Sequence, residues 1–128
     1  MKIILSVCGL IILAAIAWLS FYLTRPDHFG EPFTNVPTVE VSALFEHPTD
    51  LIGKRLQING LVKNQCQATG CYFYFLNGDK KIKIELADIA SKFPKRQGYN
   101  AKVEGYLSPY GEEYQFIGSA VEFNQTKD

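Results

Sequence analysis

The chain has 128 residues, which leaves room for one domain beyond a targeting segment. It carries 13 Lys and Arg residues against 13 Asp and Glu residues, a formal net charge of +0 at pH 7. Because Lys2 belongs to the N-terminal segment described next, the rest of the chain has a small acidic excess. A protein that binds a phosphate backbone is expected to be basic, so this balance argues against nucleic acid as a partner.

An uncharged apolar run extends from Ile3 to Leu23. An α-helix needs about 20 apolar residues to cross a bilayer, whereas the apolar region of a cleaved signal peptide usually has about 7–15. Residues 1–24 are therefore predicted to be a retained transmembrane signal anchor that contacts the membrane through residues 3–23. The alternative is a signal peptide cleaved after Ala17, because Ala15-Ile16-Ala17 has the small-x-small form that signal peptidase accepts.

The charges that flank this run predict its orientation. Lys2 favours the cytoplasmic side for the N-terminus, which places the polar remainder of the chain in the periplasm. The expected location is the inner membrane, single-pass, or the periplasm after cleavage. Residues 25–39 contain Pro26, Pro32 and Pro37 without a sustained period, and they are predicted to be an extended linker.

Residues 40–124 have the pattern of a small β-domain. Alternation, aromatic content and turn signals predict five strands, at residues 55–63, 71–76, 80–86, 100–107 and 113–123. Asn77-Gly78 is a strong hairpin signal between the second and third strands. Gly60 and Gly118 are predicted to mark bulges, where a strongly bent strand needs a kink.

Two short helical stretches complete the predicted domain. Ser42 is a suitable N-cap for a helix that Pro48 stops, and residues 87–93 form a helical stretch that Pro94 closes. Five strands with one helix between the third and fourth is the OB arrangement. The expected fold is all-β with one short helix, a five-stranded OB-type β-barrel preceded by an N-terminal transmembrane or signal helix.

Four segments within residues 28–107 carry a shared pattern: His28-Phe29-Gly30-Glu31-Pro32, Val41-Ser42-Ala43-Leu44, residues 51–62 and Gly70-Cys71-Tyr72-Phe73. They resemble a family of exported bacterial domains of unknown function. Its members read Phe-Gly-Glu-Pro, a helix, Gly-Lys-x-Val-x-Val-x-Gly-x-Val, a cysteine, and then Gly-Cys-Trp-Met. The resemblance implies an OB-like fold and an envelope location, without an established activity. Tyr72-Phe73 replace Trp-Met, so any role of that methionine as a soft metal ligand is missing here.

Cys66 and Cys71 enclose the loop between the first two predicted strands. Cysteines across a hairpin neck are within reach of a disulfide, which an oxidising compartment and a small domain favour. Such a short loop would gain about 2 kcal/mol of stability. The first alternative, a Cu(I) or Zn(II) thiolate pair, lacks further ligands, because the histidines are His28 in the linker and His47 beside Pro48. The second, a redox-active pair, is disfavoured by the C-x4-C spacing. No metal and no cofactor are therefore predicted.

Alternation places four side chains on one face of the second and third strands: Tyr72, Tyr74, Lys81 and Lys83. OB folds bind oligonucleotides and sugars on this face, and aromatic rings flanked by lysines make a stacking platform. The alternative is the ordinary solvated face of an antiparallel sheet, on which cross-strand pairs stabilise the hairpin. The four residues are a possible ligand face.

No catalytic arrangement is predicted. A nucleophile needs a base nearby, and paired carboxylates occur only as Glu112-Glu113 in a turn. The expected function is therefore not enzymatic: a monomeric, membrane-tethered binding or adaptor module for an envelope protein, peptide or glycan. One alternative is an envelope metal- or haem-handling protein, because the layout resembles the periplasmic haem chaperone of cytochrome c maturation, although its His-x-x-x-Tyr motif is not present. The other is a single-stranded nucleic-acid-binding domain.

Overall fold

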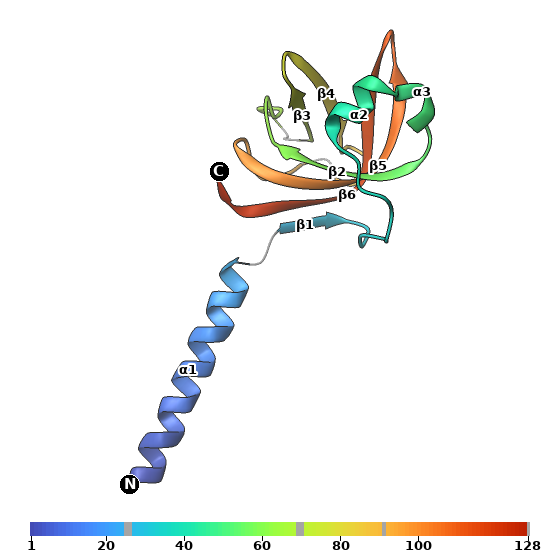
Figure 1. Cartoon of the computed structure of the whole chain (residues 1–128). Coiled ribbons are helices and arrows are strands. Elements are labelled where there is room, and N and C mark those ends of the chain that lie inside the picture. The colour runs from blue at the N-terminus through green and yellow to red at the C-terminus, as the bar shows by residue number, and fades with distance from the viewer. Residues whose placement is uncertain (25–26, 69–70, 91, 128) are drawn as a thin grey trace.

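The computed structural model describes residues 1–24, 27–68, 71–90 and 92–127. The predicted N-terminal helix is present as α1, Lys2–Thr24. Within it, Lys2–Leu23 is long and apolar enough to cross a membrane, with a mean hydropathy of 2.6 and no part of it buried in the protein. It projects away from a β-domain that carries two short helices at the opposite end (Figure 1).

In its described residues the β-domain has six strands and two helices. The five predicted strands are confirmed as β2 to β6, and β5 and β6 are longer than predicted because they pair along almost their whole length. In chain order the elements are β1 (Asp27–Gly30), α2 (Val41–Glu46), α3 (Pro48–Leu51), β2 (Arg55–Leu61), β3 (Tyr72–Asn77), β4 (Lys80–Glu85), β5 (Tyr99–Tyr110) and β6 (Glu113–Lys127).

The strands form one sheet in the order β2-β5-β6-β4-β3, and β1 pairs with β6. β4 pairs with β6 in parallel, and the other strand pairs are antiparallel. The predicted closed barrel needs correction, because β2 and β3 form no ladder with each other in the described residues. They are linked by an isolated bridge between Lys63 and Tyr74, with N–H···O distances of 3.0 and 2.8 Å. The fold is OB-like, with a sheet that stays open between β2 and β3.

The predicted inward positions are confirmed. Leu56, Ile58 and Val62 are buried, as are the aromatic rings Phe73 and Phe75. The other large side chains of the core come from the remaining strands, from α2 and from the segment between β4 and β5: Ile82, Ile84, Leu86, Phe93, Val103, Leu107, Phe116, Phe123 and Leu44. Leu44 lies on α2, which packs against both β2 and β3, so a helix covers the end of the sheet where those strands separate.

The predicted helix over residues 87–93 is not present in the part that the structure describes. Residues 87–89 form a turn, in which the Ile89 N–H donates to the Leu86 carbonyl at 3.0 Å. Phe93 is buried against the core, and Pro94 follows it directly. Pro94 also disfavours helical backbone at Phe93, the residue that precedes it.

The start of α2 also differs from the prediction. Glu40 occupies the N-cap position without a side-chain cap, and Ser42 lies inside the helix. Pro48 does not only end this helix: it begins α3, in the first-turn position where its missing N–H costs nothing. The chain therefore turns at His47 between two short helices.

The predicted linker joins the sheet near both ends of its described length. We name residues 27–39 the strap. β1, at its start, pairs with β6 in the register Phe29 to Val121. At its end Thr38 forms a parallel bridge with Gln57, whose N–H donates to Pro37 and whose carbonyl accepts from Val39, both at 2.9 Å. The strap lies along the domain instead of spacing it from α1 (Figure 1).

A fully buried carboxylate holds the middle of the strap. Glu104 on β5 accepts hydrogen bonds from the Thr34 backbone N–H at 3.0 and 3.3 Å, and from the Thr34 hydroxyl. A buried carboxylate is costly unless it is hydrogen-bonded, so these contacts tie the strap to β5.

One of the two predicted bulges is present. The β5–β6 register shifts where Gly105 faces Gly118 and Glu104 faces Ala120, which leaves Ser119 as the extra residue. Gly60 is not a bulge, because its ladder with β5 is regular. It is required for a different reason: a Cβ at this position would lie 2.7 Å from the Phe75 ring.

Candidate functional site

The four predicted face residues lie together on the outer side of the β3–β4 hairpin. Tyr74 faces Lys83 across the two strands, and both Tyr72 and Lys81 lie on the same side. The lysines approach the rings diagonally: the Lys81 Nζ lies 4.7 Å from the Tyr74 ring centroid and the Lys83 Nζ 4.8 Å from that of Tyr72. The rings of Tyr72 and Tyr74 meet edge to face at 6.2 Å. Both distances to the lysines are within the range of a cation–π interaction.

Tyr110, at the end of β5, also contacts this group. Its ring centroid lies 5.2 Å from the Lys83 Nζ, so this ammonium lies near two tyrosine rings. Tyr110 is 53% exposed and open to a ligand. The alternation of side chains within one strand does not predict that Tyr110 lies beside Lys83, because this position depends on the pairing of β4 with β6 and of β6 with β5. We name these residues the platform: Tyr72, Tyr74, Lys81, Lys83 and Tyr110.

An ion pair fixes the charge of Lys83. Its Nζ lies 3.1 Å from a carboxylate oxygen of Glu85. Partial burial lowers the pKa of Lys83, but the hydrogen bond to Glu85 and the charge of that carboxylate outweigh this effect, so the pKa is raised overall. Lys83 therefore stays protonated at neutral pH, while Lys81 is the exposed ammonium of the platform.

The Cys66 side chain lies beside Tyr72. Electrostatic repulsion from Cys66 raises the pKa of Tyr72, and desolvation and a hydrogen bond to Cys66 act in the same direction. The backbone reinforces this contact, because the Cys66 N–H donates to the Tyr72 carbonyl at 3.0 Å. Tyr72 thus keeps its hydroxyl proton and remains a hydrogen-bond donor over the whole neutral range.

The structure does not show the predicted disulfide between Cys66 and Cys71. Residues 69 and 70 of the loop between them lie outside the described residues. Lys95 holds the start of this loop, because its Nζ donates to the carbonyls of Cys66, at 2.7 Å, and Gln67. Cys71 packs against the core, and its carbonyl accepts from the Leu86 N–H at 3.0 Å.

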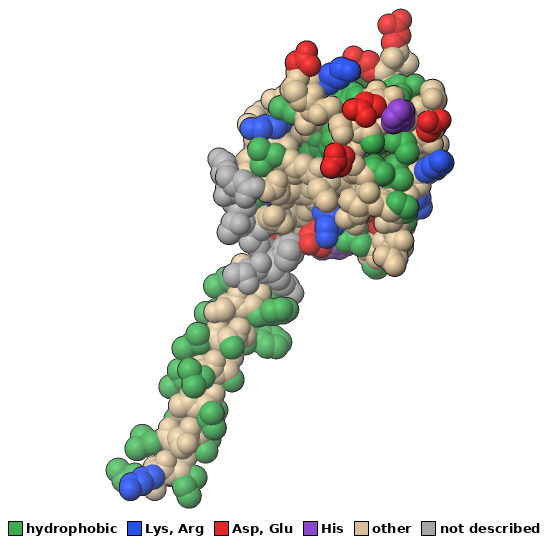
Figure 2. Space-filling model, viewed as in Figure 1, with side chains coloured by type: hydrophobic (Ala, Val, Ile, Leu, Met, Phe, Trp, Pro, Cys, Tyr) green, Lys and Arg blue, Asp and Glu red, His purple; other side chains and the backbone are tan. Residues whose placement is uncertain are grey.

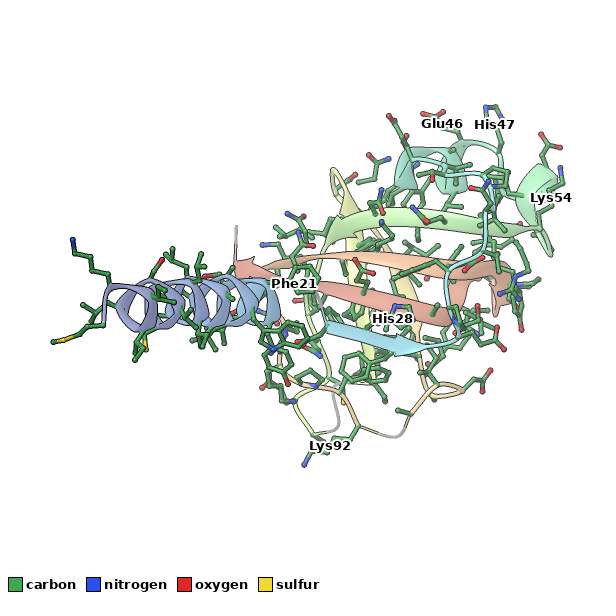
Figure 3. All side chains as sticks on the ribbon, turned by 90° about the horizontal axis from the view of Figure 1, so that it is seen from below. Phe21, His28, Glu46, His47, Lys54 and Lys92 are labelled. Atoms are coloured by element: carbon green, nitrogen blue, oxygen red, sulfur yellow. The ribbon has the colours of Figure 1, made fainter. Side chains whose placement is uncertain are left out.

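The two histidines lie far apart in the fold (Figure 3). His28 is on β1, where its Nε2 lies 2.8 Å from the Glu31 carbonyl. His47 is exposed between α2 and α3. Within the described part of the chain, no three side chains among His, Cys, Asp and Glu gather in a way that would hold a metal ion.

Charges of both signs are scattered over the β-domain, while α1 is covered with apolar side chains (Figure 2). The exposed large residues of α1 include Trp18 and Tyr22, aromatic types that favour the membrane–water interface. The fold and the platform thus define a class: an OB-like β-domain joined to an apolar N-terminal helix.

Among the comparisons with known proteins, matches come from solved structures. No family model matches the chain, and no curated protein is similar to it. Among solved structures, the hypothetical protein YgiW from E. coli aligns with a TM-score of 0.44 and 11% identity, covering 74% of this chain and 96% of that one.

Proposed function

We propose that this protein is a membrane-tethered binding module that holds an acidic protein segment on the platform. The observation that carries the proposal is the arrangement of two ammonium groups against tyrosine rings on one exposed strand pair. Lys83 is paired with the Glu85 carboxylate. Lys81 is exposed, with its ammonium against the Tyr74 ring, and it lines a hollow together with Glu112 and Glu113, so Lys81 is the ammonium that the platform offers to a ligand carboxylate. Carboxylates are the ligand groups that match ammonium and phenol donors.

The platform is also pre-organised. Each lysine is held against a ring, so less side-chain freedom is lost on binding than for a mobile lysine. The hydroxyls of Tyr72, Tyr74 and Tyr110 supply further donors beside these charges. α1 serves in this proposal as a single-pass anchor, with the β-domain in the periplasm, where segments of other envelope proteins are within reach.

The test uses the full-length protein in detergent micelles and two fluorescent peptides. One alternates glutamate with serine, and the matched control has glutamine in place of each glutamate. We expect the acidic peptide to bind at least about 10-fold more tightly, and the difference to shrink as salt screens the charges. The double variant Lys81→Gln/Lys83→Gln should lose this preference.

Lys54→Gln is the matched control, because Lys54 is an exposed lysine at the end of the domain that carries α3 (Figure 3). Equal binding of the two peptides, or the same loss from Lys54→Gln, contradicts the proposal. A single-stranded oligonucleotide is included as a competitor. If it binds more tightly than the acidic peptide, and binding depends on Lys81 and Lys83, the nucleic-acid alternative takes its place.

The Cys66–Cys71 disulfide remains part of the proposed function, as a bond formed in the oxidising periplasm. Alkylation of protein taken directly from the membrane fraction, followed by mass spectrometry, measures the thiols. The proposal expects neither cysteine to be alkylated without a reductant. Replacement of both by serine should lower the free energy of unfolding by about 2 kcal/mol. Alkylation of both in the native protein contradicts it.

A further inference from the structure

The hollow that Lys81 lines lies directly beside the platform. It has a volume of ≈ 520 Å³ and is enclosed by α2, the β3–β4 hairpin and the β5–β6 hairpin. Figure 1 shows the tips of these two hairpins at the end of the β-domain opposite α1, with α2 beside them. A segment of another protein can therefore reach the hollow without contacting the apolar helix.

The position of α2 explains why a hollow is present at this end of the domain. The helix packs mainly against β2 and β3. The hollow is lined instead by Ile82 of β4 and Tyr114 of β6, together with side chains of α2. It is the part of this end that lies between α2 and the β4 and β6 side of the sheet.

The inner lining of the hollow is apolar. Leu44 and Ile82 are buried, and Phe45, Pro48 and Tyr114 are half-buried. Phe45 and Tyr114 also pack against the core, which holds both rings in place. An aliphatic side chain that enters the hollow would remove apolar surface from water on both partners, so the lining favours an apolar occupant.

The wall formed by the β3–β4 hairpin carries a net positive charge. Lys80 and Lys81 begin β4, and Asp79 precedes them in the turn. The Lys80 Nζ lies 5.8 Å from the Phe45 ring centroid, within the range of a cation–π interaction. Lys81 also contacts the Tyr74 ring, so it belongs to both the hollow and the platform.

The wall formed by the β5–β6 hairpin is acidic. Glu112 and Glu113 are exposed and line the hollow. Among the residues that the structure describes, neither carboxylate is in an ion pair. A basic group that approaches this wall would therefore find two carboxylates that no cation of the chain neutralises.

These two walls restrict the charge of a matching ligand. A purely acidic segment would be attracted by Lys81 and repelled by Glu112 and Glu113. A segment with one acidic, one apolar and one basic side chain fits the platform, the lining and the acidic wall together. Because alternate side chains of an extended segment point the same way, its pattern is acidic-x-apolar-x-basic.

We propose that the segment held by the platform has this pattern, and that its apolar side chain binds in the hollow. The acidic side chain would pair with Lys81 and the basic one with Glu112 or Glu113. This inference rests on the proposed function, because one segment is taken to contact both parts. It narrows the ligand from an acidic segment in general to one with an apolar side chain two residues from the carboxylate.

The probes are acetylated and amidated peptides of seven residues, in which serine alternates with glutamate, leucine and lysine in that order. Full-length protein is held in lipid nanodiscs, so that no free detergent competes for the hollow. We expect serine in place of leucine to weaken binding at least about 10-fold, because a buried leucine side chain is lost. Glutamine in place of lysine should weaken it about 3-fold, as expected for an exposed ion pair.

Variants of the protein assign each effect to a wall. Glu112→Gln/Glu113→Gln should abolish the difference between the lysine and glutamine peptides and keep the leucine effect. Phe45→Ala removes part of the lining and should reduce the leucine effect, with unfolding measurements to show that it is folded. Leu76→Ala is the matched control, because Leu76 is an exposed apolar residue outside the lining, and it should bind all three peptides as the parent protein does.

Cross-linking locates the apolar side chain without any variant. A peptide with a diazirine analogue of leucine is illuminated on the parent protein, and mass spectrometry should find the cross-links at Phe45, Pro48, Tyr114 or their sequence neighbours. Cross-links confined to other residues overturn the inference. A glutamate preference with a leucine effect below about 2-fold also overturns it and leaves the platform in place. Absence of the glutamate preference, with the leucine effect and its cross-links intact, overturns the platform and not the hollow.

Discussion

Glu104 shows how one buried side chain organises a region that its sequence neighbours do not specify. The carboxylate is fully buried on β5, and the groups that donate to it come from Thr34, far away in the chain. Hydrogen bonds to a charged group contribute about 1.5–3 kcal/mol, more than those between neutral groups. The strap is therefore fixed at its middle as well as at its two ends.

Replacement of this carboxylate tests that role. Glu104→Gln keeps the shape of the side chain but leaves one acceptor oxygen in place of two and removes the charge. We expect the free energy of unfolding, measured by urea titration, to fall by about 1–3 kcal/mol. Glu113→Gln, at the exposed start of β6, is the control and should change stability by less than about 0.5 kcal/mol. If both variants unfold alike, Glu104 does not hold the strap.

The pKa of the Tyr72 hydroxyl depends on whether the neighbouring Cys66 carries an ionisable thiol. Because Cys66 raises the pKa of Tyr72, deprotonation of this hydroxyl needs a more alkaline solution than that of an ordinary tyrosine. In the reduced protein we expect Cys66→Ala to move the pKa of Tyr72 back toward its ordinary value, and Cys8→Ala to leave it unchanged. Nuclear magnetic resonance of the labelled tyrosine ring carbon measures it. The disulfide would act in the same direction as Cys66→Ala, because it removes the ionisable thiol.

Among the elements, the strap decides where the folded domain begins. Phe29 of β1 packs edge to face on Phe93 and Phe123, at centroid distances of 5.2 and 6.0 Å. Arg96 pairs with Asp27 at the start of β1. The strand thus adds to the core and covers an edge of β6, which an unpaired strand would leave exposed to aggregation.

Truncation tests this boundary. A chain that starts at residue 25 keeps β1 and should unfold cooperatively as a monomer. A chain that starts at residue 40 loses β1, the Thr34 contact to Glu104 and the Phe29 packing, and we expect it to be less stable by at least about 3 kcal/mol, or to aggregate. Circular dichroism, thermal unfolding and gel filtration compare the two. Equal stability would show that residues 27–39 are only a spacer.

For the whole molecule, the short connection from α1 to β1 constrains function. α1 ends at Thr24 and β1 begins at Asp27, so a membrane-embedded α1 would keep the β-domain close to the bilayer. A binding module of this layout would sample ligands near the membrane surface. The proposed anchor therefore bears directly on which partners the platform can reach.

Fractionation tests the anchor. We expect a C-terminally tagged protein to stay with the membrane after a carbonate wash, and its tag to be cut by protease added to spheroplasts, because α1 would remain inserted with its N-terminus in the cytoplasm. A protein released to the soluble periplasmic fraction with Trp18 as its first residue would instead show cleavage after Ala17. Protection of the tag in spheroplasts would reverse the proposed orientation.

Local pattern was sufficient for α1, for β2 to β6 and for part of the platform. The apolar run, the five strands and the burial of Ile58, Phe73 and Phe75 follow from periodicity, because side-chain direction alternates along a strand whatever its partners are. The placement of Tyr72, Tyr74, Lys81 and Lys83 on one face follows from the same rule, with the Asn77-Gly78 turn setting the register of the hairpin.

Tertiary structure alone decided the features that join distant segments. The parallel pairing of β4 with β6 brings Tyr110 to the platform. β1, which lies in a proline-rich stretch, pairs with the edge of β6. The burial of Glu104 and the opening of the sheet between β2 and β3 also depend on which segment lies alongside which strand. A periodic pattern indicates on which face of a strand a side chain lies, but it does not indicate which strand lies beside it. Strand order, the position of the strap and the opening between β2 and β3 follow from how separated segments satisfy one another's backbone and polar groups.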